Sequence, residues 1–448
     1  HQDEDVLDTW FSSWLWPFSV FDWPRETAEL AKFYPTSSLV TGPDIIFFWV
    51  ARMIMAGIEF MGDIPFRDVY FTSIIRDDRG RKLSKSLNNS PDPLDVIDTY
   101  GADALRFTMI YISPTGQDLR YSNEKCEIGR NFANKLWNAG RFRRHHGDPT
   151  GNWRDLGDLR ESDLRPDDRW LLARLTETVQ ATTSALEKFQ FHDMVHALYD
   201  FVWNEFCDWY VESSKSPLSG SDDRQRSVAL RIFDHVMAAI LRLLHPVMPF
   251  VTEELYHQLG FAEEDESIML AAWPEPLPAE CRQAIGATAE TVGLVESKFE
   301  LIRGIRNIRS TYQIPPNQKV PAIIVPADSR AEAFLSQDTD SIRILLNASE
   351  LTVEPSYSGE GPTATAVGTL GTGYLPLKGI VDFDAERERL KKQESEIQGF
   401  IEKSNRKLSN EKFVAKAPDH VVQLEKDRVV ELNEKLRRVH ERLEALQL

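Results

Sequence analysis

The chain has 448 residues, a net charge of −18 at pH 7 and 42% hydrophobic residues. We expect several hydrophobic cores, because single cores rarely grow beyond about 250–300 residues. The acidic balance disfavours indiscriminate DNA binding, and no apolar run reaches the roughly 18 residues that a membrane span needs.

The three cysteines, Cys126, Cys207 and Cys281, are widely separated in the sequence. This spacing argues against a disulfide framework and against a structural zinc site, so we expect no bound metal in this chain. Unpaired cysteines are typical of proteins in a reducing compartment. We therefore predict a cytoplasmic protein that binds neither DNA nor a membrane.

The first 75 residues indicate an α/β arrangement. Residues 1–25 mix aromatic and turn-forming residues, as expected for the wall of a pocket. The stretch Thr41-Gly42-Pro43-Asp44 then begins an apolar helix that we predict to end near Met61. Asp44 would lie at the positive end of this helix, where a carboxylate is favourable. A strand is predicted over residues 66–75.

A loop with an unusual density of polar groups follows that strand. Lys82-Leu83-Ser84-Lys85-Ser86 places two lysines and two serines in five residues. Ammonium groups neutralise phosphate charge, hydroxyls add hydrogen bonds, and a mobile loop can close over a nucleotide. The strand–loop–helix order would place such a site at the carboxyl end of a parallel strand. A basic surface loop is the alternative interpretation of these five residues.

The middle of the chain is predicted to be helical. Long amphipathic runs joined by polar links are typical of an antiparallel helical bundle. These runs cover 124–144, 168–190, 193–212, 225–247 and 288–310. Residues 125–144 hold six Lys/Arg against one acid. A local basic surface on an acidic protein suits binding of one nucleic acid at specific sites. Short β-type runs and Gly-rich turns over residues 318–380 predict a small α/β module.

The end of the chain predicts a helical hairpin. Its second arm carries a heptad seam. The seam residues are Val429, Leu432, Leu436, Val439, Leu443 and Leu446. A break over residues 409–419, which contain Pro418, separates the two arms. A hairpin of this kind is too thin for a core of its own, so we expect it to act as a strut, a dimer contact or a reaching arm.

Three blocks near the start of the chain resemble the second half of a class I aminoacyl-tRNA synthetase catalytic domain. They are residues 6–13 with Asp8 and Trp10, residues 42–49, and the loop 82–86. Two later blocks, 131–142 and 409–418, narrow the resemblance to the bacterial valyl-tRNA synthetase family. With the terminal hairpin, it covers essentially the whole chain.

This resemblance implies an α/β part followed by helical and smaller parts. The expected domains are the second half of a Rossmann-type catalytic domain (1–120), an all-α anticodon-binding bundle (121–315), a small α/β module (316–381) and a C-terminal antiparallel coiled coil that binds tRNA (382–448). The implied activity is ATP-dependent activation of valine to valyl-adenylate and transfer to tRNA(Val). ATP with Mg²⁺ would be a substrate, and the enzyme would be a monomer.

The resemblance also assigns roles in the reaction. Lys82 and Lys85 would be catalytic, because they stabilise the ATP phosphates while the valine carboxylate attacks the α-phosphorus. The implied ATP-binding residues are Gly42, Asp44, Ser84, Lys85 and Ser86. A simple helix cap is the alternative role of Asp44, and the two roles are compatible.

The resemblance further implies two sets of recognition residues. Trp10, Ile45 and Trp49 would line the valine pocket, where rigid walls reject a larger side chain. For Ile45 the alternative is plain hydrophobic core. The implied tRNA-binding residues are Asn134, Lys135, Asn138 and Phe142. Amides can read base edges and an aromatic ring can stack on an unpaired base, although Phe142 fits the core equally well.

No His-x-Gly-His sequence occurs in the chain, which opens at His1 within structured sequence. We therefore expect the C-terminal part of a longer enzyme, and we expect this chain alone to be inactive. The alternatives are a non-catalytic tRNA-binding protein, a subunit of a split synthetase, or a related isoleucyl- or leucyl-tRNA synthetase. A long coiled-coil scaffold explains the sequence least well, because it accounts for none of residues 1–145.

Overall fold

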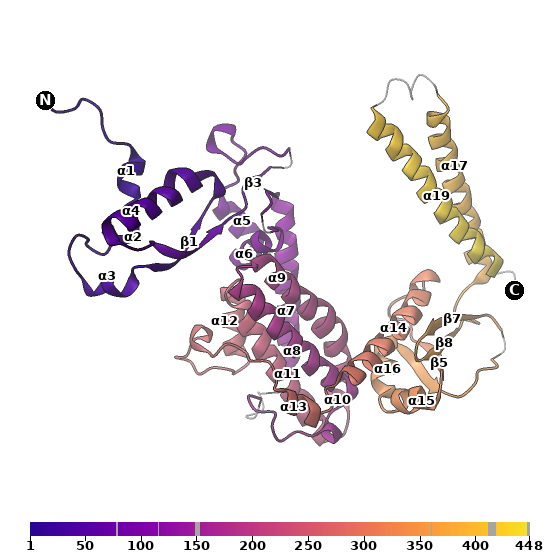
Figure 1. The fold of residues 1–448 in the computed structure, drawn as a ribbon. Coiled ribbons are helices and arrows are strands. Elements are labelled where there is room, and N and C mark those ends of the chain that lie inside the picture. The colour runs from indigo at the N-terminus through magenta and orange to yellow at the C-terminus, as the bar shows by residue number, and fades with distance from the viewer. Residues whose placement is uncertain (78, 115, 148–152, 360, 411–417, 446–448) are drawn as a thin grey trace. The chain divides into compact units, whose positions relative to one another are not determined.

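Helices make up most of this mixed α/β structure, a computed structural model that describes residues 1–448 except 78, 115, 148–152, 360, 411–417 and 446–448 (Figure 1). The chain forms two units, His1–Thr288 and Ala289–Leu448. Within the described residues, no helix combines the length and the apolar character that a membrane span requires.

The first unit begins with a small parallel α/β element. Strand β1 (Thr36–Thr41) pairs in parallel with β2 (Phe66–Phe71), from Thr36 opposite Phe66 to Thr41 opposite Phe71. Parallel strands need a crossover connection, which α4 (Ala51–Met61) supplies. Its start is irregular, with a 3₁₀ turn at Pro43–Ile45 and a π-helical turn at Ile46–Val50.

Buried side chains of both strands and of the crossover helix form the core of this element. They are Leu39, Val50, Met53 and Phe66. Three short helices precede the first strand: α1 (Thr9–Ser13), α2 (Trp16–Ser19) and α3 (Ala28–Phe33).

The predicted strand over residues 66–75 is divided in two. Strand β2 ends at Phe71, and β3 (Ile75–Arg76) pairs in parallel with a different strand, β4 (Leu119–Arg120). The chain passes from one two-stranded sheet to another between them. The lysine-rich loop follows β3 and contains a 3₁₀ turn at Lys85–Leu87.

A helical bundle forms the rest of the first unit. Its helices are α5 (Pro93–Tyr100), α6 (Ala102–Tyr111), α7 (Cys126–Arg144), α8 (Pro166–Glu187), α9 (Phe191–Tyr199), α10 (Val211–Ser219), α11 (Asp223–Leu244), α12 (Pro249–Gln258) and α13 (Ala279–Ala284). A π-helical stretch, Asp200–Tyr210, joins α9 directly to α10. The bundle core includes fully buried Phe132, Phe206 and Phe233.

A buried ion pair joins two helices of this bundle. The Arg143 guanidinium donates to both carboxylate oxygens of Asp234, at 2.5 and 2.7 Å. Both side chains are only 1% exposed. This pair fixes α7 against α11.

The second unit contains a four-stranded sheet in the order β6-β5-β8-β7. Strand β5 (Val320–Pro326) runs parallel to β6 (Ala348–Val353), and β8 (Gly371–Pro376) runs antiparallel to both β5 and β7 (Thr363–Gly368). Two short helices, α15 (Ser329–Ser336) and α16 (Thr339–Leu346), connect β5 to β6.

Helix α14 (Ala289–Thr311) packs on this sheet, whereas we predicted residues 288–310 within the helical bundle. Its apolar face packs closely against the sheet at Gly373 of β8, where there is no room for a side chain. A Cβ atom at this position would lie only 2.5 Å from Ile305 Cδ1. Its cations are also engaged inside this unit. Lys298 is buried and donates to Asp338 at 3.4 Å, and Arg306 donates to Leu345 O at 2.6 Å.

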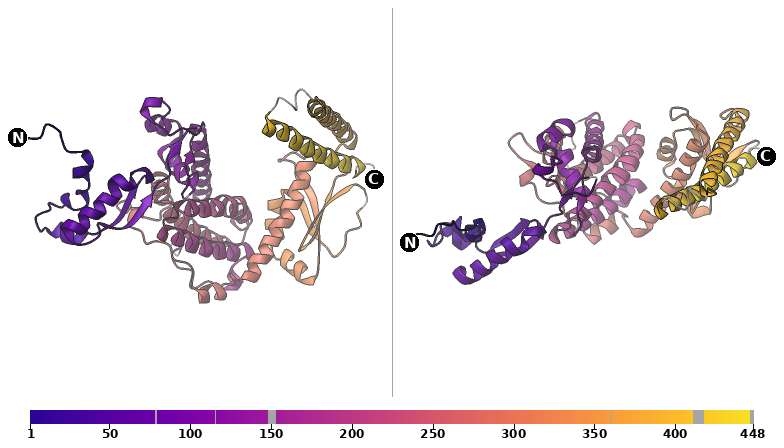
Figure 2. Two further views of the ribbon diagram at one scale, coloured as in Figure 1. Left: turned by 45° about the horizontal axis from the view of Figure 1, so that its top comes forward. Right: turned by 90° about the horizontal axis from the view of Figure 1, so that it is seen from above.

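Two long helices, α17 (Phe383–Leu408) and α19 (Asp419–Ala445), lie side by side at the end of the chain in every view (Figures 1 and 2). Leu390, Ile397 and Val439 are buried between them. The flanking seam residues are Ile401, Leu432, Leu436 and Leu443. The predicted seam residue Leu446 lies outside the described residues.

Candidate functional site

The turn after β1 and the lysine-rich loop after β3 bring together several of the predicted ATP-binding and catalytic residues. Gly42 follows β1 directly and precedes the 3₁₀ turn that contains Asp44 and half-buried Ile45. Lys82 reaches this turn from the lysine-rich loop: its Nζ atom lies 2.8 Å from Asp44 Oδ2. Both side chains are more than half exposed, at 57% and 51%.

The Lys82 ammonium donates a hydrogen bond to Asp44 and thereby lowers the pKa of this carboxyl below its ordinary value. Asp44 is therefore ionised at neutral pH. An exposed ion pair of this kind contributes little to stability, because water screens both charges. Both groups are thus available to a ligand that offers stronger partners.

A side chain that sequence reasoning missed, Asn89, holds the lysine-rich loop. Its Oδ1 accepts from Ser84 N at 2.9 Å, and its Nδ2 donates to Lys82 O at 3.3 Å and to Asp77 Oδ2 at 3.0 Å. Asn89 and Arg81 both donate to the Asp77 carboxylate and hold its pKa well below the usual range. The only sequence signal was the Asn- and Pro-rich turn after the loop.

The hydroxyls of the loop lie on one tight turn. Ser84 Oγ and Ser86 Oγ are 3.2 Å apart, and Ser84 Oγ also accepts from Leu87 N at 3.3 Å. Lys85 begins the 3₁₀ turn, but its side chain lies outside the described residues.

The predicted valine-pocket tryptophans lie where α1 meets the π-helical turn before α4. Asp8 caps α1 through Trp10 N at 3.3 Å and lies 3.7 Å from Arg52. The Trp10 ring stacks on Phe48 at 6.1 Å, and Trp49 Nε1 donates to Ser13 O at 3.4 Å.

A cavity of about 260 Å³ lies beside these tryptophans. Trp49 lines it together with Trp16, whose ring stacks on Trp49 at 5.7 Å. Among the described residues, Trp10 and Ile45 are not part of its wall.

Large apolar side chains near this site are unusually exposed. Phe47 is 72% exposed, and Phe11 and Phe48 are 48% and 45% exposed. Parallel sheets are normally covered on both faces, and an exposed patch of this kind usually marks a contact surface.

The predicted tRNA-binding residues of α7 differ in their exposure. Asn134 and Asn138 are exposed, four residues apart. Lys135 is half-buried: its Nζ lies 2.5 Å from Asp208 Oδ1 and 3.9 Å from the centre of the Trp203 ring. The half-buried Phe142 packs against Leu218, Ala229 and Leu230.

The cations near the tip of the hairpin are only partly described. Lys407 lies 2.6 Å from Glu425 of the opposite helix. Lys412 and Lys416 lie outside the described residues. Among the described residues, no group of three or more His, Cys, Asp or Glu side chains could hold a metal ion.

Three family models match successive parts of the chain. Class I tRNA synthetases (I, L, M and V) match residues 1–122, and the anticodon-binding domain of tRNA ligases matches residues 168–324. The valyl-tRNA synthetase tRNA-binding arm matches residues 382–447. The order of the matches agrees with the order of α/β element, bundle and hairpin.

Similarity to a solved structure gives evidence on the fold of this chain and on nothing else. The LeuRS–tRNA–LeuAMS ternary complex of Agrobacterium radiobacter K84 matches with a TM-score of 0.50 and 17% identity, over 73% of this chain and 36% of that chain.

Among curated relatives, a valine–tRNA ligase of Chlorobaculum tepidum is 43% identical over 99% of this chain and 50% of its own length. A valine–tRNA ligase of Bacillus thuringiensis is 43% identical over 100% of this chain and 50% of its own. The chain thus spans about half the length of the curated relatives it matches. With the family-specific tRNA-binding arm, these matches show that the chain belongs to the valine–tRNA ligase family of class I tRNA synthetases.

Proposed function

We propose that the chain supplies the nucleotide-phosphate and tRNA-binding parts of a valine–tRNA ligase. The reaction is ATP-dependent formation of valyl-adenylate, followed by transfer of valine to tRNA(Val). The observation that carries this proposal is the 2.8 Å contact between Lys82, in the loop after β3, and Asp44, in the turn after β1. The names of the relatives favour valine over isoleucine or leucine as the amino acid.

The proposed chemistry needs charge neutralisation and positioning rather than a protein nucleophile. The valine carboxylate attacks the α-phosphorus of ATP, whose Mg²⁺ belongs to the substrate, and pyrophosphate leaves. Lys82 exchanges its exposed contact with Asp44 for a phosphate oxygen, and Asp44 then accepts from ribose hydroxyls. Lys85 stabilises the same phosphates, with the Ser84 and Ser86 hydroxyls beside it.

The fold supports this assignment of the first part. We propose that residues 1–120, with the β1–α4–β2 crossover, are the second half of a Rossmann-type catalytic domain. Further polypeptide of the catalytic domain would cover exposed Phe47 and Phe48 and would complete the valine pocket around Trp10 and Trp49. The relatives have twice the length of this chain, which leaves room for that polypeptide.

We propose that the remaining parts bind tRNA(Val). The bundle reads the anticodon with Asn134 and Asn138, whose amides are exposed on α7. We keep its predicted end at residue 315, because the match to the anticodon-binding domain runs to residue 324, although α14 packs on the sheet of the second unit. The sheet module follows, and residues 382–448 form an antiparallel coiled coil against tRNA. We also propose a cytoplasmic, monomeric enzyme.

A chimaera tests this function. This chain replaces the matching half of the Chlorobaculum tepidum relative, and valine-dependent ATP–pyrophosphate exchange and tRNA(Val) charging are measured. We expect both activities, and we expect Lys82→Ala and Lys85→Ala each to lower exchange by at least a hundredfold while tRNA affinity changes less than threefold.

The matched control is Lys215→Ala, which removes an exposed lysine that pairs with Glu212 in the bundle. This variant should exchange at the unmodified rate. Unchanged exchange by both loop variants would remove the lysines from the mechanism. The 448-residue chain by itself should show no exchange, so measurable exchange would refute the proposed division of the catalytic domain.

A further inference from the structure

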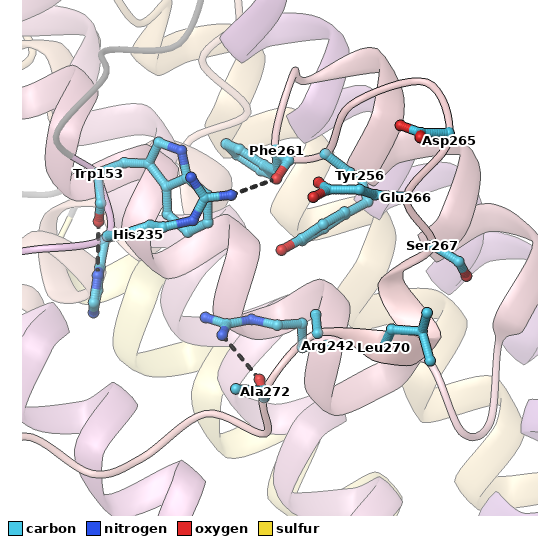
Figure 3. Close-up of a pocket in the computed structure, with 13 residues that line it drawn as sticks. Trp153, His235, Arg242, Tyr256, Phe261, Asp265, Glu266, Ser267, Leu270 and Ala272 are labelled. Carbon is cyan, nitrogen blue, oxygen red and sulfur yellow. Dashed lines mark hydrogen bonds between the residues drawn. The ribbon is translucent and has the colours of Figure 1, made fainter.

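A second cavity lies in the helical bundle, apart from the residues assigned to catalysis. It encloses about 480 Å³, which is within the usual range of small-molecule sites, about 300–1,000 Å³. Its walls come from α11, α12, the segment at Trp153 and the loop of residues 261–272 (Figure 3). Trp153, Tyr256 and Phe261 supply aromatic surface.

Two arginines of this cavity carry positive charge without a carboxylate partner. Arg242 donates to the backbone oxygens of Ala238 and Ala272, both at 3.0 Å. Arg154 donates to Phe261 O at 2.9 Å and lies 4.4 Å from the centre of the Trp153 ring. In the part of the chain that the structure describes, neither guanidinium lies within 4 Å of a carboxylate.

The charge of Arg242 is poorly compensated. Burial lowers the pKa of its guanidinium below the ordinary value; Tyr256 acts in the opposite direction, and Arg154 lowers the pKa further. The partly buried Arg242 and the exposed Arg154 repel each other, and two such cations at the wall of a cavity favour an anionic ligand. Arginine is the residue best suited to a phosphate, because its planar fork can donate two parallel hydrogen bonds.

A neutral donor faces the same space. Figure 3 shows the Tyr256 hydroxyl and the Arg242 guanidinium directed into the cavity from different walls. Within the described residues, this hydroxyl has no hydrogen-bond partner. His235 donates from Nδ1 to Trp153 O at 3.0 Å, because the carbonyl oxygen can only accept. Burial lowers the pKa of His235 to about 4.

The rim of the cavity carries the opposite charge. Asp265 and Glu266 line it on the loop, and Glu253 fixes this loop by accepting from Ser267 Oγ at 3.0 Å. Carboxylates at the rim oppose a bare anion but accept hydrogen bonds from hydroxyl and amino groups. A ligand with an anionic end, a flat ring and further donors therefore fits better than inorganic phosphate.

We propose that this cavity binds one nucleotide, with its phosphate on Arg154 and Arg242 and its base against the aromatic wall. The nucleotide is either a free nucleoside monophosphate or a single residue of an RNA chain, since both present the same groups. The inference does not depend on the proposed ligase activity, because no residue of the cavity belongs to that site.

Calorimetric titration of the 448-residue chain with 5′-AMP at low salt tests the proposal. We expect saturable binding, at least tenfold weaker binding of adenosine and of inorganic phosphate, and at least tenfold loss of 5′-AMP affinity in Arg154→Gln and Arg242→Gln. The matched control is Arg224→Gln, which removes an exposed arginine that pairs with Asp163 outside the cavity.

Further variants separate ligand binding from folding and from the other nucleotide site. Tyr256→Phe removes only the hydroxyl and should weaken binding severalfold, with thermal unfolding unchanged. Lys82→Ala should leave the cavity's affinity unchanged. The proposal would be overturned if Lys82→Ala abolished 5′-AMP binding and Arg242→Gln left it intact. It would also be overturned if adenosine bound as tightly as 5′-AMP, or if phenylalanine, an aromatic zwitterion without a phosphate, bound more tightly than 5′-AMP.

A competition experiment identifies the source of the nucleotide. A single-stranded RNA oligonucleotide that displaces 5′-AMP from the unmodified chain, and from Lys82→Ala, assigns the cavity to an RNA residue. Failure to displace it assigns the cavity to a free mononucleotide.

Discussion

Lys82 Nζ lies 2.8 Å from Asp44 Oδ2, so the lysine-rich loop touches the turn that follows the first strand of the α/β element. The two residues are 38 positions apart in sequence. Their contact joins a phosphate-binding candidate to a ribose-binding candidate.

This contact predicts a pH effect. The hydrogen bond from Lys82 lowers the pKa of Asp44 below its ordinary value of 3.8. The folded value lies below the unfolded one, so the contact is fully formed at neutral pH and is lost only as the pH falls through the folded pKa. Carbon-detected NMR titration should show a higher Asp44 pKa in Lys82→Ala than in the unmodified chain. An equal value in both would show that the contact is absent in solution.

Asn89 is predicted to hold the lysine-rich loop in place. Asn89→Ala removes hydrogen bonds to Ser84 N, Lys82 O and Asp77, each worth about 0.5–1.5 kcal/mol. Amide hydrogen exchange over residues 82–87 should accelerate by about tenfold or more, while exchange in the helical bundle stays unchanged.

Asn88→Gly is the matched control for this loop. Asn88 has a φ of 48°, in the left-handed region where glycine is readily accepted. Its exchange rates should resemble those of the unmodified chain. Equal exchange in Asn89→Ala and the unmodified chain would exclude Asn89 as the anchor.

Removing one partner of the ion pair between Arg143 and Asp234 is predicted to destabilise the bundle strongly. Replacing both partners by apolar residues is predicted to destabilise it much less. Arg143→Met should destabilise the bundle by about 3–5 kcal/mol, because it leaves the Asp234 carboxylate buried without its partner. The double variant Arg143→Met/Asp234→Leu should recover most of this loss. Urea unfolding measures both, and a double variant as unstable as the sum of the single variants would contradict the prediction.

Three of the four tRNA-binding candidates of α7 should separate into two classes. Asn134→Ala and Asn138→Ala should weaken tRNA(Val) binding by about tenfold without a change in unfolding temperature, because both amides are exposed. Phe142→Ala should instead lower stability by about 1–3 kcal/mol, because its ring packs against Leu230 and Phe233.

Filter binding and thermal unfolding on the same samples distinguish the two classes. Glu127→Ala, at an exposed position of the same helix, is the control and should change neither measurement. Normal tRNA affinity in both asparagine variants would place the RNA-binding face elsewhere on the bundle.

Much of the helical framework could be predicted from periodicity, because a 3.6-residue repeat marks the buried face of a helix. Periodicity does not tell which surface that face meets. Helix α14 was therefore expected to pack in the bundle. In the structure it packs on the sheet of the second unit, where Ile305 lies against Gly373.

The candidate site could be predicted in part, because the residue types of a short motif, such as the lysines and serines of residues 82–86, indicate the ligand that they can bind. Asp44, directly after Gly42 and Pro43 in the turn after β1, meets Lys82 of the lysine-rich loop after β3, two segments that the sequence motifs had singled out. The role of Asn89 depends on a turn geometry that spacing alone does not reveal. The contact of Lys135 with Asp208 joins residues 73 positions apart, which no local pattern could indicate.

The most direct test is a crystal structure of the chimaera with a non-hydrolysable valyl-adenylate analogue. We expect the ribose hydroxyls on Asp44, the phosphate within hydrogen-bonding distance of Lys82 or Lys85, and the valine side chain beside Trp10 and Trp49. An analogue bound away from all three groups would contradict the proposed active site.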